Sequence, residues 1–195
     1  MLRGRDSAEI NAEGKLKESD ARTVMDVYAA CVVKHRYLRV KKALKLAPGG
    51  QDQRKSLTDV STNECLDSGT LGFSAPLLRG ALYKALVRRE LAVTPVTVPA
   101  EPLHFTASDE WALGEVAKLT FAQCLYRREP GLVHDLLFTQ ASSAAERAVL
   151  GRITPLLQAC VEPTNQLAFT KAELVGLLAE VYYRSVAPSA PENQG

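Results

Sequence analysis

Long apolar runs are missing from this sequence of 195 residues. No stretch approaches the roughly 20 apolar residues that a membrane-spanning helix needs, so we expect no transmembrane segment. The polar first twenty residues contain no apolar signal-peptide core, so we expect no secretory signal in the chain as it stands. Charge of one sign is also scarce, because 24 Lys and Arg against 22 Asp and Glu leave a net charge of +2. That balance argues against a histone-like nucleic-acid binder.

Catalytic and metal-binding motifs are missing as well. The sequence has no Gly-rich phosphate loop, no Gly-x-Ser-x-Gly elbow and no His-Glu-x-x-His. Cys-x-x-Cys is absent, and the histidines are not at the spacing of metal ligands. These histidines are His35, His104 and His134. We therefore predict no catalytic residue, no metal and no cofactor.

Two polar clusters come nearest to a site, His134-Asp135 and Asp109-Glu110-Trp111. Asp109 and Glu110 are more simply the acids of a first helical turn, where they favour the helix dipole. Trp111 is more simply a core or interface anchor. Neither cluster carries a function on sequence grounds, because its geometry is unknown at this stage.

A stretch that occurs twice is the clearest positive feature. Residues 73–88 read FSAPLLRGALYKALVR, and residues 169–184, 96 positions later, read FTKAELVGLLAEVYYR. We predict one helix for each copy. Gly80 and Gly176 recur at the same place in these helices, where a glycine costs up to about 1 kcal/mol. Either a neighbouring helix passes close to each glycine, or the pair simply reflects one duplicated ancestor.

The rest of the chain repeats at offsets of 93 to 95 positions. Apolar residues at helical spacing predict helices over 21–34, 37–46 and 52–66 in the first half. Matching helices are predicted in the second half, over 109–128, 132–138 and 144–161, with Pro155 kinking or splitting the last one. Hydroxyl residues can cap several of these helices, and two of them begin capping boxes. These cap residues are Ser74, Ser143 and Thr170.

The predicted fold class is all-α, with two tandem pseudo-repeated four-helix units. The first unit spans 19–90 and the second 108–186. Residues 91–107 contain three prolines and form a Pro-rich extended linker. Residues 1–18 and 187–195 are predicted to be a disordered arm and tail, because they offer little to bury. Units of this size bury their apolar stripes incompletely, so we expect the two to pack on each other.

The four cysteines lie at matching places in the two units. Cys31 and Cys65 are 34 residues apart, and Cys124 and Cys160 are 36 apart. Four cysteines allow three pairings, and the duplication favours Cys31–Cys65 with Cys124–Cys160. The alternative is four reduced core cysteines. Disulfides would favour a periplasmic or secreted protein, and free thiols a cytoplasmic one.

A basic stretch in the first unit places six cations within twelve residues. Residues 19–90 carry 13 Lys and Arg against 7 Asp and Glu, whereas residues 108–186 carry 7 against 9. Such a face can bind nucleic-acid phosphate, anionic lipid or an acidic protein, can dock on the acidic second unit, or can simply serve solubility. Its members are Lys34, Arg36, Arg39, Lys41, Lys42 and Lys45.

The paired pattern of aromatic-x-x-Cys, Cys-Leu, Leu-x-Phe and Leu-Arg-Gly-Ala-Leu resembles an uncharacterised family of small bacterial helical proteins, many of which look exported. The resemblance covers residues 24–90 and 117–184. It implies export and disulfides and carries no known activity.

We expect a non-enzymatic helical-repeat scaffold or protein-interaction module, whose partner is another protein or a second copy of itself. The first alternative is an anion binder that uses the basic stretch, with nucleic acid or an anionic membrane as the partner. The second alternative is a small-ligand binder or enzyme with a pocket between the two units.

Overall fold

The computed structural model describes residues 18–66, 72–107, 110–161 and 167–187. Within these ranges the protein is all-helical, and no strand is present, as the sequence predicts. Seven α-helices and two short 3-10 helices follow one another along the described chain. They are α1 (Glu18–Leu44), α2 (Gln51–Val60), η1 (Asn63–Cys65), α3 (Ala75–Glu90), α4 (Glu110–Arg128), α5 (Pro130–Phe138), α6 (Ala144–Ile153), η2 (Thr154–Cys160) and α7 (Lys171–Val186).

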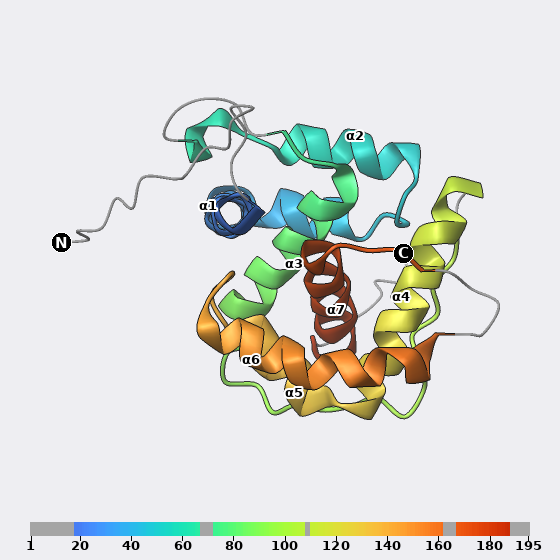
Figure 1. Cartoon of the computed structure of the whole chain (residues 1–195). Coiled ribbons are helices and arrows are strands. Elements are labelled where there is room, and N and C mark those ends of the chain that lie inside the picture. Colours follow the sequence, from blue (N-terminus) through green and yellow to red (C-terminus); the bar gives the residue numbers. More distant parts are fainter. Residues whose placement is uncertain (1–17, 67–71, 108–109, 162–166, 188–195) are drawn as a thin grey trace.

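Helices α3 and α7, the two copies of the repeated stretch, form the centre of the molecule (Figure 1). Helix α1 packs on α3 and α4 packs on α7. In Figure 1, α1 and α2 lie above this central pair, while α5 and α6 lie below it. More than half of the residues of each central helix are buried, and the other helices pack around them.

The predicted helices agree with the structure at two breaks and need one correction. The helices expected over 21–34 and 37–46 are the two parts of α1, which is broken at Arg36, where φ is −127° and ψ is 32°. The helix expected over 52–66 ends at Val60, because Ser61 and Thr62 are extended and Thr62 starts η1 by accepting a hydrogen bond from the Glu64 amide. The helix expected over 144–161 becomes η2 from Thr154 onward, so Pro155 does split it.

The helix caps follow the sequence in part. Thr170 forms the complete capping box with Glu173 at the start of α7. Ser143 accepts the Glu146 amide, but the Glu146 carboxylate binds the amide of Ser142. Ser74 makes no side-chain cap bond, so its predicted capping role is wrong.

Residues 91–107 contain no helix or strand and run beside α4. The hydroxyl of Tyr126 donates to the Thr97 carbonyl, and Gln123 binds both the amide and the carbonyl of Leu103. Arg127 donates to two further carbonyls in the same segment. These bonds fix the connecting segment to α4 instead of leaving it free in solvent.

Candidate functional site

The α3–α7 crossing has Gly80 and Gly176 at its contact point. A Cβ atom built on Gly80 would lie 2.5 Å from the Gly176 Cα atom, and one built on Gly176 would lie 2.7 Å from the Gly80 Cα atom. The neighbour expected to pass close to each glycine is therefore the other glycine's helix. Because neither residue has a side chain, the backbones touch, and a hollow can form on either side of the contact.

On the α1 side of this crossing lies an open groove of about 240 Å³ between α1, α3 and α7. Its walls are small or apolar, and Gly80 and Gly176 contribute to its lining. Residues spaced three and four apart on α3 face the same direction, so one stripe of that helix forms one wall. The apolar wall residues are Ala21 and Met25 of α1, Phe73 just before α3, Leu77 and Ala81 of α3, and Ala172 and Val175 of α7.

One part of the groove carries charge. The Lys84 ammonium lies 2.6 Å from an Asp26 carboxylate oxygen, and only 4% of the Lys84 side chain is exposed. Arg22 binds Glu146, whose side chain is 1% exposed, at 2.5 Å. Burial lowers the pKa of Lys84 below that of an ordinary lysine, although the Asp26 carboxylate opposes this shift. The Arg88 guanidinium lies 3.9 Å from a carboxylate oxygen of Asp26.

The opposite side of the crossing is filled. Its remaining cavity is only about 20 Å³. Arg79 and Glu180 form a bidentate ion pair there, with both N···O distances 2.6 Å, and both side chains are buried. Burial alone would lower the pKa of Arg79, but Glu180 overrides this effect and raises it. Arg79 also donates to the carbonyls of Leu44 and Leu46, so this pair fastens the end of α1 to both central helices.

Further charges and a larger apolar side chain complete the filled side. Lys118 of α4 bridges Glu115 and Glu173, at 3.2 and 3.5 Å. Leu177 of α7 also lines this side, 96 positions after the small Ala81 that lines the open groove. The two sides of one crossing therefore differ in both volume and chemistry.

Two of the six cations of the basic stretch are committed to internal contacts. Arg36, at the break in α1, donates to the carbonyls of Asp59 and Ser61 and so holds the end of α2. Lys41 binds Glu90 and the Tyr37 hydroxyl, and it lies 5.8 Å from the centre of the Tyr183 ring. Burial would lower the pKa of Lys41, but its hydrogen bonds to Tyr183 and Tyr37 raise it.

The other four cations of the basic stretch are exposed, and no carboxylate of the described residues pairs with them. Leu38 lies among them with 78% of its surface exposed. The acidic second unit does not neutralise this surface in the described part of the chain. These four cations, called the basic surface below, are Lys34, Arg39, Lys42 and Lys45.

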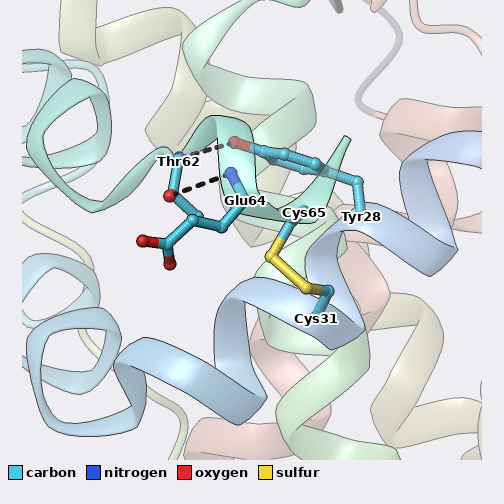
Figure 2. Close-up of a disulfide and its surroundings, with 5 residues drawn as sticks. All are labelled: Tyr28, Cys31, Thr62, Glu64 and Cys65. Atoms are coloured by element: carbon cyan, nitrogen blue, oxygen red, sulfur yellow. Dashed lines mark hydrogen bonds between the residues drawn. A yellow bond between two sulfur atoms is a disulfide. The ribbon is translucent and has the colours of Figure 1, made fainter. Parts of the chain in front are cut away.

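Both predicted disulfides are present. Cys31–Cys65 joins α1 to η1, and Cys124–Cys160 joins α4 to the end of η2. Figure 2 shows how a neighbouring bond supports the first one: the Tyr28 hydroxyl accepts the Thr62 amide. The described residues contain no free cysteine. The disulfides therefore attach the short 3-10 elements, which have no buried residues of their own, to the core helices.

The polar clusters noted in the sequence do not converge on the groove. The His134 ring packs 4.7 Å from Phe138 and 6.0 Å from Tyr182, with Asp135 3.5 Å away at the surface. Asp109 lies outside the described residues, and Glu110 is exposed. His35 and His104 are also exposed. No group of three or more potential metal ligands occurs among the residues that the structure describes.

The groove and both of its ion pairs were missed by sequence reasoning. A signal was present, because Ala81 and Leu177 occupy the same repeat position with different sizes, and Lys84 and Glu180 do so with opposite charges.

No described helix is long and apolar enough to cross a bilayer. Comparisons with known protein families, curated proteins and solved structures return no match for this chain.

Proposed function

We propose that the chain consists of two copies of one four-helix unit, joined through residues 91–107 and packed together along α3 and α7. The two disulfides support this proposal, because they join corresponding elements over similar separations of 34 and 36 residues. Aromatic pairs support it too: Tyr28 packs on Phe73 with ring centres 5.6 Å apart, and Phe121 packs on Phe169 at 5.1 Å.

A matching turn gives independent support for the duplication. Gly49 and Ser142, 93 positions apart, both have positive φ, at 80° and 63°. Four residues after each, a buried side-chain oxygen accepts that residue's amide, from Gln53 in one case and Glu146 in the other. A non-glycine residue with positive φ is uncommon, so the adoption by Ser142 of a positive φ at the position that matches Gly49 favours a shared backbone design.

The function that this architecture supports best is non-enzymatic binding, with the open groove as the binding site. One observation carries the proposal: of the two sides of the Gly80–Gly176 crossing, one is filled and the other keeps an open groove whose walls are largely apolar. Burying apolar surface stabilises the folded state by about 25 cal/mol per Å², so an unfilled apolar groove forgoes stability. An apolar occupant would supply this missing burial when it binds.

A neutral fluorescent probe tests the groove without involving its charges. We expect N-phenyl-1-naphthylamine to bind with increased emission, and Ala81→Leu to abolish this binding by filling the groove. Leucine already occupies the matching position, Leu177, so the substitution suits the helix. Ala148→Leu adds the same volume at an exposed position of α6 and serves as the control.

The proposal is overturned if the probe does not bind the wild-type protein. It is also overturned if the probe binds the wild type and Ala81→Leu equally well. Circular dichroism and the urea midpoint of each variant establish that loss of binding is not loss of the fold.

The basic surface supports a second candidate function, binding of an anionic polymer or membrane. The observation that favours it is the cluster of four exposed cations without carboxylate partners, around exposed Leu38. We expect binding to heparin or anionic vesicles to weaken steeply with salt and to be lost in the Lys34→Glu, Lys42→Glu, Lys45→Glu triple variant. The double variant Arg54→Glu with Lys55→Glu reverses two exposed cations on α2 and is the control for charge reversal away from the basic surface. Binding that ignores salt argues against this function.

We propose an oxidising compartment, periplasmic or extracellular, as the place where the protein acts. The two disulfides support it, since such bonds persist mainly outside the reducing cytosol. A peptide mass map of protein from its native host, with thiols blocked at lysis, should yield linked peptides for both pairs. Four blocked thiols would instead indicate a reducing compartment.

A further inference from the structure

We infer that the open groove binds a linear aliphatic acid, with its chain along α3 and its carboxylate beside Lys84. This inference rests on the proposed binding function of the groove and adds the chemical class of the ligand. Three features of the groove support it: its size, its charge and the hydrogen-bonding capacity of Lys84.

The size of the groove favours a narrow ligand. Its volume of about 240 Å³ is below the roughly 300–1,000 Å³ of pockets for drug-sized molecules. From Leu77 to Lys84 the α3 wall extends over eight residues, or seven helical steps, a length of about 10 Å at the helical rise. An unbranched chain of medium length fits a slot of these dimensions.

The charge of the groove favours an acid over a neutral or basic ligand. Three charged residues of the described part of the chain line it, the cations Arg22 and Lys84 and the anion Asp26, which leaves one positive charge in excess. Glu146 pairs with Arg22, and Arg88 lies near Asp26. Their charges are opposite and sum to zero, so the net excess of one positive charge is unchanged. A ligand carboxylate would neutralise this excess inside a weakly polar hollow, where charge interactions are stronger than in water.

Lys84 has hydrogen-bonding capacity to spare. An ammonium group has three N–H donors, and the only hydrogen bond that Lys84 makes within the described chain goes to Asp26. Its side chain is 4% exposed and lines the groove, so little water competes for the remaining donors. A carboxylate at that place would accept a charge-assisted hydrogen bond, the stronger class of such bonds.

The charged residues also give the ligand a direction. Leu77, Ala81 and Lys84 follow one another along the same stripe of α3, so the apolar wall leads toward the ammonium group. The apolar tail therefore lies near Leu77 and Phe73, and the acid lies between α1 and α3. On the filled side the position matching Lys84 is Glu180, which would repel an acid even if space were opened there.

The test compares decanoate with decanol, two ligands that share a chain and differ in the charged end. Binding to the full-length protein is measured by calorimetry and by displacement of N-phenyl-1-naphthylamine. We expect decanoate to bind more tightly than decanol by roughly ten- to hundredfold, the range of a hydrogen bond to a charged group. Ala81→Leu should abolish binding of both ligands.

The Lys84→Met variant tests the contribution of the ligand's carboxylate separately from that of its alkyl chain. Methionine keeps an unbranched apolar side chain, and Arg88 remains near Asp26 as a partner. We expect this variant to lose the preference for decanoate while binding decanol as the wild type does. Lys118→Met removes a cation from the filled side instead and should leave both affinities unchanged.

The outcomes separate this inference from the proposed function. Equal binding of decanoate and decanol, or a preference for decanoate that survives Lys84→Met, overturns the acid assignment while the groove remains a binding site. If decanoate, decanol and the neutral probe all fail to bind, the proposed function and the ligand assignment are both wrong. Selective binding of decanoate that Ala81→Leu abolishes and Lys84→Met converts to equal binding supports both.

Discussion

The two sides of the Gly80–Gly176 crossing use corresponding positions for different purposes. Val175 and Lys84 line the open groove. The residues at the matching positions, 96 places away, are Arg79 and Glu180 respectively, and both line the filled side. The filled side thereby gains an ion pair that fastens α3, α7 and the end of α1. The open side keeps its hollow of about 240 Å³.

In the duplicated scaffold with a binding groove that we propose, this difference would separate stability from binding. Two equal copies would place the same groove on both sides of the crossing. Here one side holds the two central helices together with buried charges, so the other can remain unfilled without the helices separating. The matched positions that differ between the two sides are Ala81 and Leu177, Val175 and Arg79, and Lys84 and Glu180.

Breaking the filled side should have the largest effect on stability. Arg79→Leu leaves the Glu180 carboxylate, 3% exposed, without its principal partner, and loss of one partner of a buried pair costs about 3–5 kcal/mol. Arg184, 3.3 Å from Glu180, reduces the loss only in part, since its side chain is one-third exposed. Urea unfolding measures the change.

The double variant Arg79→Leu with Glu180→Leu is the matched control for that prediction. Replacing both members of a buried pair with apolar residues is often neutral or stabilising, so much of the stability should return. If the single and double variants are equally unstable, the carbonyl bonds of Arg79 to Leu44 and Leu46 matter more than the ion pair.

The disulfides test whether the two units are equally dependent on their cross-links. The loop-entropy relation gives about 3.8 kcal/mol for each, because separations of 34 and 36 residues are nearly equal. We therefore expect Cys31→Ala with Cys65→Ala to destabilise the protein as much as Cys124→Ala with Cys160→Ala. Thermal unfolding of both variants measures this. A difference above about 1 kcal/mol would show that native contacts, such as the Tyr28–Thr62 bond, dominate over loop entropy.

Substitutions at the crossing glycines come next in size. Gly80→Ala or Gly176→Ala brings a methyl group within 3 Å of backbone atoms, so the central helices must separate, at a cost of about 1–3 kcal/mol. Gly114→Ala in α4 is the control, because no atom lies within 4 Å of the added Cβ. It should be stabilising by up to about 1 kcal/mol through helix propensity. Equal effects at Gly80 and Gly114 would contradict the close approach.

Much of the scaffold could be predicted from periodicity and repetition. The all-α class, the disulfide pairing and the split at Pro155 depend on local spacing and on the matching of two copies. The break at Arg36 could be predicted as well, because the expected helices end at residue 34 and begin again at residue 37. The internal contacts of the basic stretch were missed: Arg36 and Lys41 belong to it by sequence, yet they bind Ser61 and Glu90 in the fold.

The open groove could not be located in this way, because it depends on which faces of two distant helices meet. Ala81 and Leu177 read as one apolar position until the crossing places them on opposite sides of the glycine contact. Lys84 reads as an exposed cation by composition, since lysine is seldom buried. Only the packing of α1 over α3 buries it beside Asp26.

The smallest predicted effect concerns the caps of the two central helices. Thr170→Ala removes the hydroxyl that accepts the Glu173 amide and should cost about 1 kcal/mol, whereas Ser74→Ala should cost almost nothing, because Ser74 makes no cap bond. Urea unfolding at neutral pH compares the two variants. Equal losses would mean that Ser74 caps α3 in solution and that the two helices start alike.

Low pH should weaken the same capping box, because it protonates the Glu173 carboxylate. Burial alone would raise the pKa of Glu173, but the Thr170 amide and Lys118 lower it below its usual value. A carboxyl whose pKa is lower in the folded state stabilises the protein above the unfolded pKa of about 4.3, and this contribution is lost as the pH falls through the folded value. Glu173→Gln removes the charge at every pH. Its unfolding free energy should therefore lie below that of the wild type at pH 7 and approach it in acid, whereas a constant gap would mean that the charge of Glu173 does not support the cap.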